Sequence, residues 1–241
     1  MWHDSLTVLW KEIAVLRRVY RKLSAFISTG LYVLFFGVFP AAFLGDDFVS
    51  SPLTLFYLTL VPLVTGTGMA TLAFAGEREV HTLETLFASR LNDLAILVGK
   101  ITAYTLYAWL YVLLCILAGW MTASMIVGRI IAYNLQILVG GLLIGFGVAF
   151  FAAVVGVLAS LMSRTIKETG RKLQVLYLVF VIPYISINLM PETARNNLLN
   201  NVTRANLWMI IGGVVVLLVI VNAGLLILAV RGFNRNQMLL D

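Results

Sequence analysis

Six long stretches of the chain contain no charged residue and no histidine, and this feature constrains the fold more than any other. They cover residues 23–45, 48–76, 101–128, 130–163, 173–191 and 205–230. A helix needs about 20 apolar residues to cross the hydrocarbon core of a bilayer, so each stretch can hold one crossing. Only 12% of the 241 residues are charged, against roughly 25% in soluble domains. The sequence therefore predicts an all-α membrane protein with six transmembrane helices.

We expect the whole chain, residues 1–241, to form a single transmembrane domain. The stretch 130–163 is too short for two crossings and a turn, so we interpret it as one long helix. The six spans are predicted at about 24–45, 53–75, 101–121, 135–162, 173–191 and 206–230. An even number of crossings places both termini on the same side.

The distribution of basic residues predicts which side this is. Fourteen of the 17 lysines and arginines flank the face that carries the termini, and three lie on the other face. Loops rich in Lys and Arg stay in the cytoplasm. We therefore expect a multi-pass protein of the cytoplasmic (inner) membrane with both termini in the cytoplasm. The net charge of +6 suits the lipid bilayer's anionic surface, and we expect no nucleic-acid partner.

Residues 1–22 have the pattern of an amphipathic helix. A stripe of apolar residues recurs every three or four positions, with charged and mostly basic residues between them; the stripe is Trp2, Leu6, Leu9, Ile13, Leu16, Tyr20 and Leu23. Such a helix can lie flat at the membrane interface. It could be a simple surface anchor, or it could also dock a cytoplasmic protein.

A charged segment follows the second span and reads "GEREVHTLETLFASRLNDLAILVGK" over residues 76–100. From Glu77 the pattern predicts a short amphipathic helix over about 77–90, lying along the membrane plane. The predicted apolar stripe is Val80, Leu83, Phe87, Leu91 and Leu94. Two interpretations stay open: a surface helix that caps the bundle, and a docking element for a soluble protein.

This segment resembles the signature loop of type-2 ABC exporter permeases, approximately E-R-E-x-G-T-x-E-x-L-L-A-S/T-P followed by a G-K pair. The matching residues are Glu77, Arg78, Glu79, Thr82, Leu83, Glu84, Leu86, Ala88, Ser89, Gly99 and Lys100. His81 stands where glycine is usual and Arg90 where proline is usual. These two departures predict a more continuous helix. The layout of the whole chain is similar to that family.

The resemblance implies the permease subunit of an ATP-driven exporter, with 77–90 as a coupling helix between spans 2 and 3 that contacts a cytoplasmic ABC ATPase. The residues implied in coupling are Glu77, Arg78, Glu79, His81, Thr82, Glu84, Phe87 and Arg90. The chain has no phosphate-binding G-x-x-x-x-G-K-[ST] motif, since Gly99-Lys100 is followed by Ile101. We therefore expect no enzyme activity and no cofactor in this chain, with ATP and magnesium on the partner ATPase. Six spans also imply a second copy of this permease, or a homologous one.

The pathway is expected to be apolar with scattered polar groups. The candidates are Thr65 and Met69 in the second span and, by the resemblance, Tyr177, Phe180, Tyr184 and Asn188 in the fifth. Spans without ionisable groups argue against an ion-coupled carrier and favour an amphiphilic or hydrophobic substrate moved outward. No catalytic or metal-binding residues are expected. The alternative function is a membrane anchor that assembles cytoplasmic proteins without transporting anything.

Overall fold

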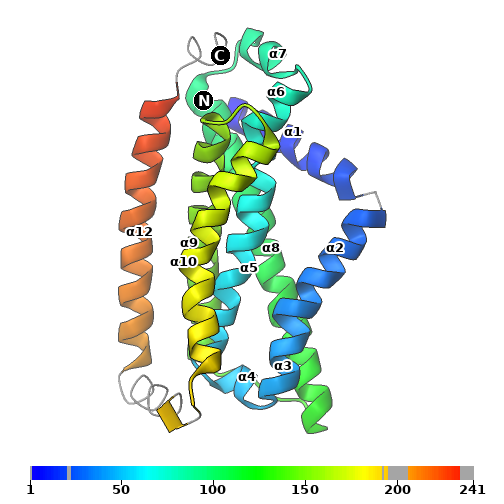
Figure 1. Cartoon of the computed structure of the whole chain (residues 1–241), viewed down its shortest axis with the longest axis vertical. Helices are drawn as coiled ribbons and strands as arrows, with labels where there is room; N and C mark the ends of the chain where they lie inside the picture. Colours follow the sequence, from blue (N-terminus) through cyan, green and yellow to red (C-terminus); the bar gives the residue numbers. More distant parts are fainter. Residues whose placement is uncertain (1, 21–22, 192, 195–205, 234–241) are drawn as a thin grey trace.

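The computed structural model describes residues 2–20, 23–191, 193–194 and 206–233, and within these ranges the regular structure is entirely helical (Figure 1). A few side chains inside helices, those of Phe87, Phe180, Tyr184 and Asn188 among them, also lie outside the described part. The helices are α1 (Trp2–Tyr20), α2 (Leu23–Val33), η1 (Leu34–Val38), α3 (Phe39–Leu44), α4 (Asp47–Ser50), α5 (Leu53–Ala70), η2 (Leu72–Gly76), α6 (Glu77–Glu79), α7 (Leu83–Ala88), α8 (Asp93–Val127), α9 (Leu135–Leu161), α10 (Ile166–Leu189) and α12 (Leu207–Gly232).

Five of the described helical rods are long and apolar enough to cross a membrane. They are Phe26–Leu44, Leu53–Glu79, Asp93–Val127, Leu135–Leu161 and Leu207–Gly232. This confirms the prediction of a multi-pass helical membrane protein, and five of the six predicted spans have a counterpart. The remaining predicted span, 173–191, falls on α10, which is not one of the five. The count of six therefore remains a prediction.

The rods stand side by side, with α5 near the centre (Figure 1). Helix α5 packs against α8 and α9, α10 packs against α9 and α5, and α12 packs mainly against α9. At one end of the bundle lie α1, α6 and α7, and at the opposite end lie α3 and α4 (Figure 1). We call the first of these the charged end, because the segment 77–90 lies there.

The first span is built from three helical pieces rather than one. Its middle, η1, is a π-helix that precedes Pro40. Proline has no N–H and cannot continue the regular hydrogen-bond ladder. Gly37 in η1 lies against α8, where an added Cβ would be 3.0 Å from the carbonyl oxygen of Cys115. The widened turn and the glycine together let the first rod approach α8 closely.

Helix α8 is much longer than the 101–121 predicted for the third span. It has 35 residues, which corresponds to about 52 Å. The side chain of Asn92 accepts a hydrogen bond from the backbone N–H of Leu94 and caps its start. Hydropathy could not place this start, because the first two turns carry Asp93 and Lys100. By contrast, α9 at Leu135–Leu161 agrees with the predicted 135–162.

Helix α1 forms over the predicted amphipathic segment, but its buried face differs from the predicted stripe. The buried residues are Val8, Glu12 and Leu16, whereas Leu6 and Ile13 are exposed. Val8 packs onto Gly99 of α8, where an added Cβ would lie 2.7 Å from the Cβ of Val8. Helix α1 is therefore packed onto the bundle, and part of its apolar surface remains uncovered.

Candidate docking site at the charged end

Four charged side chains and a tyrosine meet where α1, α6 and α8 converge. We call this group the charged junction: Lys11, Glu12, Glu77, Lys100 and Tyr104. Lys100 Nζ lies 2.7 Å from Glu12 Oε1 and 3.1 Å from Glu77 Oε1. Lys11 Nζ lies 2.6 Å from Glu77 Oε1. Tyr104 donates to Glu12 Oε2 over 2.9 Å.

The centre of the junction is buried, whereas Lys11 at its edge is exposed, so the inner charges depend on one another. Lys100 is completely buried and Glu12 is 4% exposed. Lys100 also donates to the carbonyl oxygen of Ala73 over 2.7 Å and lies over the ring of Phe74. Charges removed from water are tolerated only when they are paired and hydrogen-bonded. The two lysines and two glutamates balance in charge.

The Gly-Lys pair that ends the signature segment has a clear structural role here. Gly99 leaves room for α1 to lie against α8, because a Cβ added at Gly99 would be only 2.9 Å from the carbonyl oxygen of Ser5. Lys100, one residue later, then reaches Glu12 in the buried face of α1. Gly99 and Lys100 together fix α1 to α8.

The other two charged residues of α6 also bind the rest of the chain, although Glu79 is exposed. The guanidinium of Arg78 donates to the carbonyl oxygen of Ser163, between α9 and α10. Glu79 Oε1 accepts a 2.8 Å hydrogen bond from the backbone N–H of Ile166, the first residue of α10. The sequence predicted Glu77, Arg78 and Glu79 as contacts for a partner, but in this structure all three bind other parts of the same chain.

The segment 77–90 is not the single continuous helix that was predicted. It consists of α6 and α7, separated at residues 80–82. His81 has φ = +54°, in the left-handed region that glycine favours. His81 therefore adopts a backbone conformation expected of glycine, the residue usual at this place in the signature loop that the segment resembles. The physical reason is that the backbone must turn here: the N–H of Thr82 bonds back to the carbonyl of Glu77 over 2.9 Å.

Helix α7 has one face in the bundle and one outside. Leu83 and Leu86 are buried and pack with Phe74 and Leu97. Val80, predicted in the apolar stripe, is instead 66% exposed. The other charged or polar residues predicted for coupling are exposed, namely His81, Thr82, Glu84 and Arg90. The side chain of Phe87 lies outside the described residues. We call 80–90 the exposed lobe.

Ser160 is a residue that the sequence analysis missed. Its hydroxyl accepts hydrogen bonds from the backbone N–H groups of Phe74 and Ala75, at 3.0 and 2.8 Å, and donates to the carbonyl of Thr71. These bonds hold the π-helix η2, which joins α5 to α6. A lone serine inside an apolar span is the only sequence signal, and it does not indicate which segment the hydroxyl binds.

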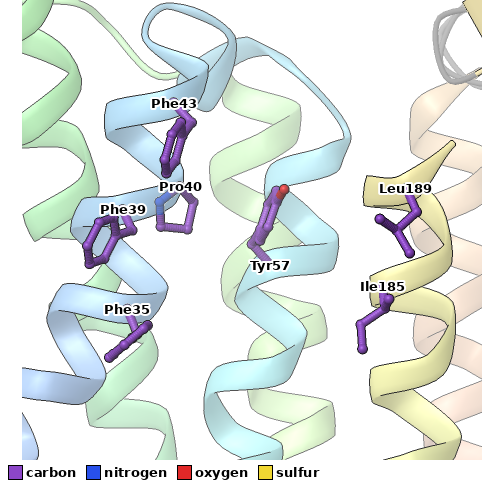
Figure 2. A pocket seen from close by; sticks show the side chains of 7 residues that line it. All are labelled: Phe35, Phe39, Pro40, Phe43, Tyr57, Ile185 and Leu189. Carbon is purple, nitrogen blue, oxygen red and sulfur yellow. The ribbon is translucent and has the colours of Figure 1, made fainter. Parts of the chain in front are cut away.

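A second feature of the structure is an apolar cleft near the opposite end of the bundle, between α3, α5 and α10. Its volume is about 490 Å³. Figure 2 shows its lining of Phe35, Phe39, Pro40, Phe43, Tyr57, Ile185 and Leu189. We call it the aromatic cleft. The sequence signal for it was a phenylalanine at every fourth position of the first span, which places the rings on one face.

Of the predicted pathway residues, the three whose side chains are described, Thr65, Met69 and Tyr177, do not line this cleft. Thr65 is buried and donates to the carbonyl of Val61 over 2.8 Å. Met69 packs against the core near the charged end. The hydroxyls of Tyr177 and Thr67 lie 2.6 Å apart and join α10 to α5. The side chains of Phe180, Tyr184 and Asn188 lie outside the described residues.

No protein-family model matches this chain, and no curated protein matches it.

Proposed function

We propose that this protein is the permease subunit of an ATP-driven exporter, in which the exposed lobe docks a separate cytoplasmic ABC ATPase. The observation that carries the proposal is the lobe itself. Its apolar residues Leu83 and Leu86 are buried in the bundle, while Glu84 and Arg90 remain exposed at the end of an apolar set of rods. A surface anchored on one face and charged on the other is suited to a soluble partner.

The charged junction supports a mechanical role for this lobe. Glu77 lies three residues before the lobe and is bound to Lys11 of α1 and Lys100 of α8. Arg78 and Glu79 bind the loop that leads into α10. A displacement of the lobe would therefore be passed to α1, α8 and α10 together, instead of being absorbed by a loose loop.

The proposal includes six crossings, with α10 as the fifth, and both termini in the cytoplasm. Helix α10 packs against α9 and α5 as a membrane-spanning neighbour would. A second copy of this permease, or a homologous one, would complete the pathway. Single cysteines at His3, Asp47 and Lys167, in a Cys115→Ala background, test this orientation. A membrane-impermeant thiol reagent added outside should label only the cysteine at 47, and labelling at 167 would exclude the proposed topology.

The aromatic cleft supports an apolar or amphiphilic substrate. Apart from the hydroxyl of Tyr57, its lining side chains in the described residues are apolar, and its size is within the usual range for ligand pockets. It lies between the first, second and fifth predicted spans. In a pair of permeases it would be a place for a substrate before release.

The decisive experiment is isolation of the protein from its native membrane under mild conditions. We expect a separate ATPase to copurify, and we expect the complex, but not this chain alone, to hydrolyse ATP faster when an amphiphile is added. Recovery of cytoplasmic proteins without any ATPase would favour the membrane-anchor alternative. ATP binding by the purified chain alone would refute the proposal.

A further inference from the structure

A second cleft lies between α9 and α12, on the side of the bundle away from α2 and α3 (Figure 1). Its volume is about 360 Å³. Both helices are among the five candidate membrane spans. The rim residues Leu143, Phe146 and Val219 are all exposed. In a membrane this cleft would therefore open sideways into the lipid.

The lining of this cleft is apolar with one exception. Of the ten residues that line it, Asn222 alone has a polar side chain. Asn222 is 7% exposed. Its amide nitrogen donates to the carbonyl oxygen of Gly147 over 3.0 Å. Its own carbonyl oxygen, Oδ1, is buried and accepts no hydrogen bond from any described residue.

The orientation of the Asn222 amide is fixed by its neighbour. Turning the amide over would place Oδ1 against the carbonyl oxygen of Gly147, and two acceptors repel each other. Oδ1 is thus an unpaired acceptor in the middle part of a membrane-spanning helix. Hydrocarbon offers no hydrogen bonds, so such a group is unfavourable there unless a donor is supplied.

Water is a poor candidate for this donor. A buried water molecule is usually held by two to four polar partners, and the remaining nine lining residues have apolar side chains or none. A turn of protein helix does not fit inside the cleft, since at about 10–12 Å across and about 5.4 Å long it takes up about 400–600 Å³, more than the 360 Å³ of the cleft. The remaining choice is a small molecule dissolved in the membrane.

We propose that the cleft between α9 and α12 binds a lipid-like molecule with an apolar body and a hydroxyl group, which donates a hydrogen bond to Asn222. Phe146 and Phe150 on α9 and Leu218 on α12 would contact the apolar body. The site is separate from the aromatic cleft and from the exposed lobe. The proposal holds whether or not the protein works with an ATPase.

The test uses two matched probes in nanodiscs of phosphatidylcholine, a lipid without hydrogen-bond donors. One probe is a long-chain alcohol with a photoreactive diazirine in its tail, and the other is its methyl ether. We expect the alcohol to label α9 and α12 roughly threefold to tenfold more than the ether, which is the effect of one hydrogen bond. In Asn222→Leu the ratio should fall to about one. The ratio is informative even if the variant is less stable, because instability lowers labelling by both probes.

Two further variants test whether the probes bind in the cleft between α9 and α12. Ala223→Phe fills the cleft and should reduce labelling by both probes. Leu217→Phe adds a ring of the same kind on the exposed outer face of α12 and should change nothing. Equal labelling by alcohol and ether in the parent protein would overturn the proposal. An unchanged ratio in Asn222→Leu, or unchanged labelling in Ala223→Phe, would do so as well.

Discussion

Residues 77–79 and 80–90 belong to one charged segment, yet their charged side chains differ in their contacts. Glu77, Arg78 and Glu79 all bind other parts of the chain. Glu84 and Arg90, a few residues later, are exposed. The first part fixes the segment to the bundle, and the second part is available to a partner. Charge in a membrane protein therefore does not by itself mark a docking surface, because the same residues can form an internal joint.

The physical basis of the difference is the turn at residues 80–82. A continuous helix from Glu77 would rotate its side chains by a fixed step and would keep the predicted apolar stripe, Val80 included, on one face. The positive φ of His81 interrupts this rotation. It allows Glu77 and Arg78 of α6 to stay partly buried while α7 presents a new face.

The largest effect should come from removing Lys100, the most deeply buried charge that holds residues 77–79. Lys100→Met should lower the free energy of unfolding by about 3–5 kcal/mol, because Glu12 and Glu77 lose their shared ammonium partner in a buried site. The measurement is denaturant or thermal unfolding in detergent. Lys167→Met, at an exposed position, is the matched control.

The same experiment can separate the loss of Lys100 side-chain packing from the loss of its charge pairing with Glu12. Glu12→Gln in the Lys100→Met background removes the buried charge that has lost its closest partner, so part of the lost stability should return. If Lys100→Met unfolds within about 0.5 kcal/mol of the parent, the junction does not hold the charged end together.

The next largest effect concerns the exposed lobe, residues 80–90. The substitution should change binding of a partner and leave stability unchanged. Glu84→Lys should weaken binding of the proposed ATPase, since a charge-assisted hydrogen bond contributes about 1.5–3 kcal/mol when shielded and less at an exposed rim. The measurement is the amount of ATPase that copurifies at equal membrane abundance. Asp47→Lys makes the same charge change at the opposite end of the bundle and should have no effect. If Glu84→Lys and Asp47→Lys recover equal amounts of ATPase, the exposed lobe is only a solvated cap of the bundle.

Much of the fold could be predicted from the sequence because membrane spans are encoded locally. Runs of about 20 apolar residues predict helices without any knowledge of tertiary contacts, and α9 agrees with its prediction at both ends. The start of α8 could not be predicted in this way. Its first turns are charged, and the charge of Lys100 is buried there because it pairs with Glu12, which lies 88 residues earlier in the chain.

The candidate site could be located from the sequence, but its two parts, residues 77–79 and 80–90, could not be told apart. The segment 77–90 was identified correctly as the charged element at one end of the bundle, yet its inner and outer parts look alike in sequence. The inner part is determined by Lys11, Lys100 and Ser163, which come from distant elements. The break at His81 had a signal that was misinterpreted: histidine in place of glycine was taken as favouring a continuous helix.

A smaller effect should distinguish a broken segment from a continuous one. At φ = +54° a β-branched residue is strongly disfavoured and glycine is not. His81→Val should therefore be less stable than His81→Gly by about 1–3 kcal/mol. In a continuous helix the order would reverse, because glycine is there the worse of the two residues by a few tenths of a kcal/mol. Unfolding of the two variants side by side decides between these structures.

The smallest effect concerns the start of α10, against which the inner part of the segment rests. Glu168 lies in the first turn of α10, and its carboxylate accepts hydrogen bonds from Lys172 and from the backbone N–H of Arg164. These bonds, the first of them most strongly, lower the pKa of Glu168 from its ordinary value of 4.5. A carboxylate with a lowered pKa contributes its full effect above the ordinary value and loses it as the pH falls below that value. Hydrogen exchange at the first turn of α10 should therefore speed up below about pH 4.5 in the parent, relative to Glu168→Gln measured at the same pH. Glu84→Gln, in the exposed lobe, should exchange like the parent at this turn. If Glu168→Gln and the parent respond identically to acid, the carboxylate of Glu168 does not hold the start of α10, and Glu79, which accepts from the N–H of Ile166, is the acidic residue that remains to hold it.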